Sequence, residues 1–221
     1  MSEQLLPISL DIETSGGNPS EHGIWQIGAV ELENPENVFL EEGRIDEEDK
    51  TNNEALIICG KTEEELRDKE KQSQEQLIKN FLRWTKNLEN RDLICHNPQF
   101  DQSFIRNKAI KYWKKYPFWE DKTHRAFDLH TIAQMKFYEI NNKFLTKEDN
   151  NSDMGLRNIL KLCGIQDTRR SVRGEEISRE GTPHNALEDA KLTAECFSRL
   201  MFGKNLFEEY AKFEIQQELK K

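Results

Sequence analysis

The stretch Ser9-Leu10-Asp11-Ile12-Glu13-Thr14-Ser15-Gly16 decides the fold and the site that we predict for this chain. Side chains alternate between the two faces of a strand, so Leu10 and Ile12 should enter a core while Asp11 and Glu13 share the other face. The strand ends in a Thr-Ser-Gly-Gly turn, the position at which an α/β sheet presents its ligands. Two neighbouring carboxylates repel each other, and a divalent cation relieves that repulsion. A strand end with solvated acids explains the same pattern, so a metal site requires further carboxylates at this point.

Length and charge limit the possible functions. A chain of 221 residues can fill one core, and we predict one domain over 1–203 followed by a helical tail over 204–221. The chain has 32 Lys and Arg against 41 Asp and Glu, a net charge of -9. This balance argues against broad electrostatic adhesion to nucleic acid. An enzyme that grips a strand end through metal ions needs few cationic contacts, so a polynucleotide substrate remains compatible.

The cysteines and the N-terminus indicate the compartment. Cys59, Cys95, Cys163 and Cys196 form no Cys-x-x-Cys pair, which favours reduced, buried thiols. Residues 1–7 have neither the basic nor the apolar segment of a signal peptide, and no later run reaches a membrane-spanning length. We therefore expect a cytoplasmic protein without a membrane anchor.

Periodicity and capping residues predict the other elements. Strands are expected over 23–31, 37–43 and 92–95, with a turn at 33–36 between the first two. Helices are expected at a series of capped or periodic segments, namely from Thr62, over 73–87, from Pro98, over 127–138, over 156–163, from Asn185, and after Met201 in the tail.

Two of these helices carry acids near their first turn. In His96-Asn97-Pro98-Gln99-Phe100-Asp101, Asn97 is a predicted cap and Asp101 falls in the first turn. An acid there is commonplace, because the helix dipole favours it. In the last helix, Asp189 shares a flank with small residues that allow close approach to the sheet. His184 precedes that helix and is free to lie over the same place.

Four arginines place positive charge in the loop before the last helix, although the chain as a whole is negatively charged. Arg169, Arg170, Arg173 and Arg179 could position phosphates. A solvated loop explains them equally well.

The ordered set of Asp11 and Glu13, His96-Asn97-x-x-Phe100-Asp101 and His184-x-x-x-x-Asp189 resembles the DEDDh 3'-to-5' exonucleases. This DnaQ-like group includes the proofreading subunit of bacterial DNA polymerase III, ribonuclease T and oligoribonuclease. The resemblance covers roughly residues 7–201 and implies an α/β, ribonuclease H-like fold with a five-stranded mixed β-sheet flanked by α-helices. His184 indicates the DEDDh branch, since the sister branch has Tyr at the position of Asn185. Ser15 stands where Thr is more usual, which keeps the hydroxyl.

The resemblance also implies roles for individual residues. The four metal-binding acids would be Asp11, Glu13, Asp101 and Asp189, and His184 would be the general base. Their oxygen ligands suit two divalent cations, Mg²⁺ or Mn²⁺. Asp11 is expected to bridge the two ions and Glu13 to hold one ion and the 3'-terminal sugar. The terminal nucleotide is expected to contact a further group of residues, namely Thr14, Ser15, Gly16, Asn97 and Phe100.

The expected activity is removal of nucleoside 5'-monophosphates from the 3' end of single-stranded nucleic acid, with DNA favoured. An exonuclease that processes RNA or degrades oligoribonucleotides is the alternative, because the residues that sense the 2'-OH are not evident in the sequence. An inactive nucleic-acid-binding or polymerase-associated module is a third reading. A polymerase or another replication or repair protein is the expected partner, and the family resemblance is compatible with a monomer or a homodimer.

Overall fold

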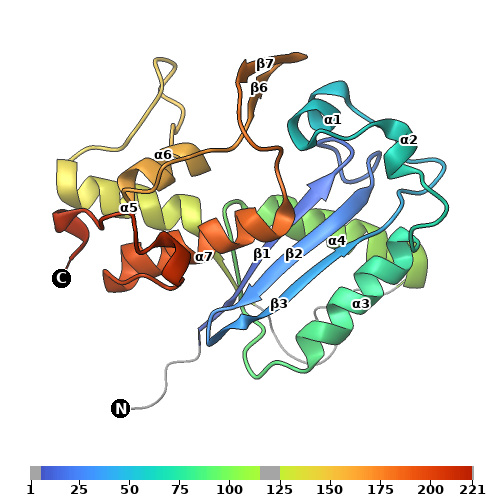
Figure 1. Ribbon diagram of the computed structural model, residues 1–221, viewed down its shortest axis with the longest axis horizontal. Coiled ribbons are helices and arrows are strands. Elements are labelled where there is room, and N and C mark those ends of the chain that lie inside the picture. Colours follow the sequence, from blue (N-terminus) through green and yellow to red (C-terminus); the bar gives the residue numbers. More distant parts are fainter. Residues whose placement is uncertain (1–5, 115–124, 221) are drawn as a thin grey trace.

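The computed structural model describes residues 6–114 and 125–220, and its centre is a five-stranded mixed sheet (Figure 1). The strand order is β3-β2-β1-β4-β5. The strands are β1 (Ile8–Thr14), β2 (Ile24–Glu31), β3 (Asn34–Glu42), β4 (Leu93–Cys95) and β5 (Ala126–Asp128). β1 pairs antiparallel with β2 and parallel with β4. The predicted ribonuclease H-like sheet is confirmed.

Helices cover both faces of the sheet. They are α1 (Asn53–Cys59), α2 (Glu63–Leu66), α3 (Gln74–Lys86), α4 (Pro98–Trp113), α5 (Leu129–Asn141), α6 (Leu156–Leu162) and α7 (Ala186–Phe202). α3 and α4 pack on one face, and α7, with α5 and α6 beside it, packs on the other. A hairpin of β6 (Ser171–Arg173) and β7 (Glu176–Arg179) projects from the body between α6 and α1 (Figure 1). None of the described helices is long and apolar enough to cross a bilayer.

The central strand β1 is covered on both sides. Leu10 and Ile12 belong to the core formed with α3 and α4. On the other face, the Ser9 hydroxyl donates to the Ala190 carbonyl of α7 at 2.7 Å. The predicted alternation is therefore confirmed, and Asp11 and Glu13 lie on the face that α7 covers.

Several predicted boundaries are wrong. The turn between β2 and β3 is at Leu32 and Glu33, not 33–36, and β3 begins at Asn34. Pro35 is tolerated there because β3 is an edge strand. No helix was expected at α1, which begins at Asn53 and is capped by the Asn52 side chain.

The expected C-terminal helix does not form. Gly203 ends α7 at φ 63°, and the helical turns within residues 204–220 are two 3-10 turns, at Glu208–Tyr210 and Gln217–Leu219. The backbone N–H groups of Leu206 and Phe207 donate to the buried Glu195 carboxylate, which ties this segment to α7. The tail packs on the core of α5, α6 and α7. The domain division at 203 stays a prediction.

The cysteines agree with the sequence analysis. All four are buried and none is in a disulfide. Burial raises the pKa of Cys95 well above its ordinary value, which fits an unreactive thiol.

Candidate active site

The carboxylates named from the sequence meet at the end of β1. Glu13, Asp101 and Asp189 are almost fully buried, with exposed fractions of 8%, 4% and 4% for the whole residues. Asp101 reaches β1 from the first turn of α4, where its carboxylate accepts a hydrogen bond from the Ile12 backbone N–H. Parallel pairing of β1 with β4 makes this possible, because it places the start of α4 beside the end of β1.

α7 brings the fourth acid to the same point, and β2 determines how closely that helix approaches. Gly28 is the cross-strand partner of Asp11, and a Cβ atom at Gly28 would lie 2.1 Å from the Leu187 nitrogen. Next along the strand, the Gln26 side-chain oxygen accepts the Ala186 N–H at 2.8 Å. The first turn of α7 therefore rests directly on β2, and Asp189 faces the acids of β1.

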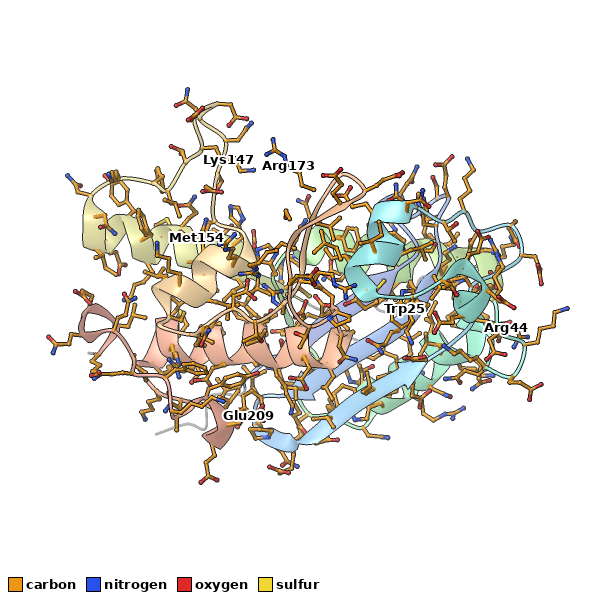
Figure 2. The ribbon with its side chains drawn as sticks, turned by 45° about the horizontal axis from the view of Figure 1, so that its top comes forward. Trp25, Arg44, Lys147, Met154, Arg173 and Glu209 are labelled. Carbon is orange, nitrogen blue, oxygen red and sulfur yellow. The ribbon has the colours of Figure 1, made fainter. Side chains whose placement is uncertain are left out.

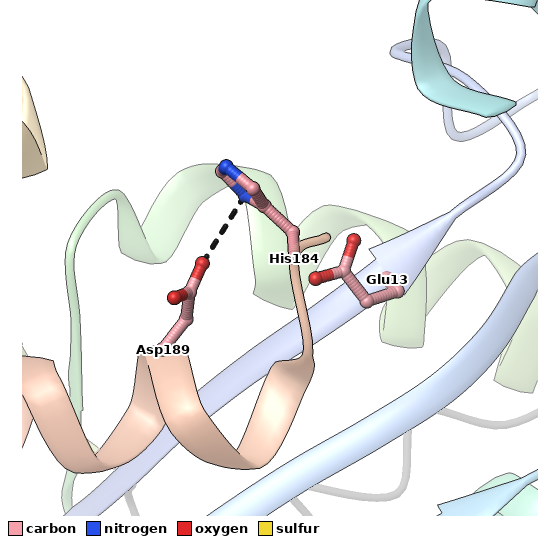
Figure 3. Close-up of side chains that lie close together, drawn as sticks. All are labelled: Glu13, His184 and Asp189. Carbon is pink, nitrogen blue, oxygen red and sulfur yellow. Dashed lines mark ion pairs between the residues drawn. The ribbon is translucent and has the colours of Figure 1, made fainter. Parts of the chain in front are cut away.

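Figure 3 shows the side chains of His184, Glu13 and Asp189 close together. Single ligand atoms of these three side chains all lie within 4.8 Å of one another. His184 Nδ1 is 3.3 Å from Asp189 Oδ2, and Nε2 is 3.0 Å from the Arg170 carbonyl oxygen. The backbone N–H of His184 donates to the Ile58 carbonyl of α1. The ring is therefore held from two sides.

The packed acids resist ionisation. Burial and the charges of the other three acids raise the pKa of Asp11 well above its ordinary value. Burial, with the nearby Asp189, raises the pKa of Glu13 to about 8, and burial raises that of Asp101 to about 7. Burial alone would lower the pKa of His184, but its hydrogen bond to Asp189 and the charge of that carboxylate raise it. Arg169 lowers the pKa of Asp11 and Glu13, but it does not offset burial and the charges of the neighbouring acids.

The donor set fits a divalent metal ion. Asp189 Oδ1 is buried, and no residue in the described ranges forms a hydrogen bond with it. A buried carboxylate oxygen is costly without a partner, and a coordinated cation would supply one. Carboxylate oxygens are the ligands that Mg²⁺ and Mn²⁺ prefer. The acids with His184 can therefore hold a metal ion.

The residues expected to bind the substrate surround the cluster. Ser15 is fully buried, and its hydroxyl donates to the Lys50 carbonyl and accepts the Gly23 N–H. Backbone groups of the Thr14–Gly16 turn are also bonded internally, because the Ser15 N–H donates to the Gly23 carbonyl, the Ser15 carbonyl accepts the Asn52 N–H and the Gly16 carbonyl accepts the Thr14 hydroxyl. Asn97 caps α4 without a side-chain hydrogen bond, contrary to the prediction, and is exposed. Phe100 is half-buried, with its ring 4.9 Å from that of Phe104.

The sequence analysis missed the role of Arg169 in the cluster. Its Nη1 lies 3.1 Å from Asp189 Oδ2, and its Nε lies 3.0 Å from Asp167 Oδ1. Arg179 Nη2 lies 2.7 Å from the other carboxylate oxygen of Asp167, Oδ2. The arginine-rich segment is evident in the sequence. No local pattern predicts that its arginines pair with Asp167 and Asp189.

Comparison with known proteins agrees with this geometry. The family model described as "Exonuclease" matches residues 8–197, which contain all the acids and His184. The chain belongs to this exonuclease family. It is a DnaQ-like member of the 3'-5' exonucleases, as the ordered motifs indicated.

Similar proteins are larger than this exonuclease chain. It is 27% identical over 194 residues to the PolC-type DNA polymerase III of Thermotoga petrophila, covering 88% of this chain and 12% of that protein. Among solved structures, apo exonuclease I matches with a TM-score of 0.66 at 17% identity, covering 90% of this chain and 42% of that one. E. coli exonuclease I in complex with a dA16 oligonucleotide gives 0.64 at 18% identity, covering 93% and 43%. These likenesses to solved structures support the fold.

Proposed function

We propose that this chain is a metal-dependent 3'-5' exonuclease that removes nucleoside 5'-monophosphates from single-stranded nucleic acid, with DNA favoured. The observation that carries the proposal is the meeting of Asp11, Glu13, Asp101 and Asp189 under His184 at the end of β1. A binding module would have no use for four mutually repelling acids. The PolC-type relative and the oligonucleotide complexes of exonuclease I support a DNA substrate and an association with a polymerase.

The four acids would hold two divalent cations, Mg²⁺ or Mn²⁺. When bound, such ions neutralise charge that develops on the attacking and leaving oxygens of the phosphodiester. Asp189 Oδ1, which has no partner among the described residues, is the atom most in need of that contact. Arg169 would then be a cationic group near the reacting phosphate.

His184 would take a proton from the attacking water through Nδ1. In the neutral ring, the Arg170 carbonyl fixes the hydrogen on Nε2, so Nδ1 carries the free lone pair. Nδ1 also faces the acid cluster, since it lies beside Asp189. After accepting the proton, the imidazolium would donate through Nε2 to the Arg170 carbonyl and through Nδ1 to the Asp189 carboxylate.

The terminal nucleotide would lie on the other side of the acids from α7. Backbone groups of Thr14, Ser15 and Gly16 would approach its sugar, and Phe100 would offer a ring edge for its base with Asn97 beside it. A Cβ atom at residue 16 would lie 2.3 Å from the His22 ring, which explains why this tight turn has glycine there. Recognition of a chain end would then come from the shape of this pocket.

The decisive experiment digests 5'-labelled single-stranded DNA, RNA and short oligomers with Mg²⁺ or Mn²⁺. A ladder that shortens from the 3' end is expected, and EDTA or Asp11→Ala should abolish it. His184→Ala should lower the rate by about 10²–10⁴-fold, the usual contribution of a general base. His130→Ala is the matched control, because the contacts of that ring in the described structure are a hydrogen bond with Ser152 and the His96 ring at 6.2 Å, and none is with the acids.

Three outcomes have different meanings. A preference for RNA or very short oligomers would replace DNA with the alternative substrate class. Products cut from the 5' end would contradict the proposed polarity. The absence of products on every substrate, with oligonucleotide binding retained, would favour a binding module.

A further inference from the structure

A polar groove lies beside the acid cluster, against α6. Its volume is about 700 Å³, and its walls are α6, the segment at 164–167 and the last residue of β7. The basic side chains on it are Arg157, Lys161 and Arg179. We call it the α6 groove.

The α6 groove has more basic than acidic side chains on its walls, although the chain as a whole is acidic. Arg157 and Lys161 are exposed and stand one helical turn apart on α6. Asp167 also lines the groove, but its two oxygens are neutralised by Arg169 and Arg179 at 3.0 and 2.7 Å. The guanidinium of Arg179 beside it lowers the pKa of Asp167 despite burial, so this acid stays paired and ionised. Asp153 is the remaining acid on the walls.

The groove begins one side chain away from the reacting centre. Arg169 connects them, because it bonds Asp167 with Nε and Asp189 with Nη1. On the opposite side, the Thr14–Gly16 turn is tied to α1, where the Ser15 carbonyl accepts the Asn52 N–H at 2.7 Å. Figure 1 shows α1 and α6 on opposite sides of the β6–β7 hairpin. A strand whose 3' end reached the turn would continue across the acids towards α6.

We propose that the α6 groove binds the sugar–phosphate backbone of single-stranded nucleic acid on the 5' side of the scissile bond. The inference rests on the proposed exonuclease function and adds the path of the strand. Arg157 and Lys161 would contact successive phosphates, and Arg179 would face the strand where it leaves Arg169. Phosphate contacts of this kind position a strand without reading its sequence, which suits an enzyme that moves along it.

The test compares substrates of different length in an Arg157→Ala/Lys161→Ala variant. The loss in kcat/KM should grow with length, from little on a dinucleotide to about tenfold or more on a strand of about 15 nucleotides. Removing two phosphate contacts should also reduce the salt slope of log K by about 1.4 for a single strand. Binding can be measured independently of catalysis by fluorescence anisotropy of a labelled strand in the Asp11→Ala background.

The control is Lys79→Ala/Arg83→Ala on α3. These exposed basic residues have the same four-residue spacing on a helix that packs against the other face of the sheet. This variant should leave kcat/KM on the short and the long substrate unchanged, and also the salt slope of log K.

The outcomes separate the two proposals. Equal losses on short and long substrates, or no loss of strand binding in the Arg157→Ala/Lys161→Ala variant, would overturn the groove proposal while leaving the exonuclease intact. Inactivity of the unaltered protein on every substrate would overturn the proposed function instead, and the anisotropy measurement would still decide whether the groove holds a strand.

Discussion

The two oxygens of Asp189 have different environments. Oδ2 faces Arg169 and His184 at 3.1 and 3.3 Å, whereas Oδ1 is buried without a hydrogen bond from the described residues. Arg169 therefore provides the nearest fixed positive charge in a cluster that otherwise repels itself. Its guanidinium and a metal ion would compete for the same carboxylate.

Arg169→Ala should strengthen metal binding. Removing the guanidinium frees Asp189 and leaves the cluster one charge more negative, so the Kd for Mn²⁺ should fall by about 3- to 10-fold. Isothermal titration calorimetry of the protein without substrate measures this directly. Arg173→Ala is the control, because Arg173 lies at the exposed end of the hairpin (Figure 2). Weaker binding in Arg169→Ala would mean that Arg169 orients Asp189 for the metal.

At the scale of elements, the position of α7 on β2 assembles the site. Asp11 and Gly28 are cross-strand partners, and so are Glu13 and Gln26. The two residues that support the start of α7 therefore stand directly beside the two acids of β1. Small displacements of the helix would separate Asp189 from both.

Gly28→Ala should damage stability and activity together. The added methyl group would meet backbone atoms of Ala186 and Leu187 at 2.1–2.5 Å, and backbone cannot rotate away as a side chain can. Overpacking of this kind lowers the free energy of unfolding by about 1–3 kcal/mol. Urea unfolding and Mn²⁺ titration would measure the two effects. Gly17→Ala should be neutral for stability, because its Cβ meets nothing within 4 Å. Unchanged metal affinity in Gly28→Ala would show that α7 can shift without loss of the site.

At the scale of the whole molecule, the acid cluster makes stability depend on pH. Glu13 and Asp101 have pKa values of about 8 and 7 in the folded protein, against ordinary values of 4.5 and 3.8. The folded state therefore binds protons more tightly than the unfolded state between these limits. The stability that these two acids contribute is therefore greatest below about pH 4, and it decreases as the pH rises to about 8, where both acids are ionised in the folded state.

The metal-free protein should accordingly melt at a lower temperature at pH 8.5 than at pH 6. Each loss of about 1 kcal/mol corresponds to about 2–4 °C in Tm for a chain of this size. Thermal unfolding in EDTA would measure the slope, and saturating Mn²⁺ should remove most of it because the cation stabilises the ionised acids. Glu13→Gln should make the Tm of the metal-free protein depend less steeply on pH. A metal-free Tm that did not fall with pH would contradict the raised pKa values.

Local patterns predicted much of the architecture. The Leu10 and Ile12 alternation predicted β1, Asn185 is the cap that was expected, and the Thr62 capping box is present. Each signal is contained within a few residues, so it can be read without the fold. The helix predicted for the tail was wrong, because that segment is held by tertiary contacts such as the hydrogen bonds from Leu206 and Phe207 to the buried Glu195.

By itself, the sequence determined which acids and which histidine could form a site, in what order, and on which kinds of element. Only the tertiary structure decided how they meet. Gln26 and Ala186 are 160 residues apart, yet their hydrogen bond seats α7, and Arg169 reaches Asp189 across 20 residues. Side-chain periodicity and capping arise from neighbouring residues, whereas strand register and charge pairing depend on contacts between distant segments that exist only once the chain has folded.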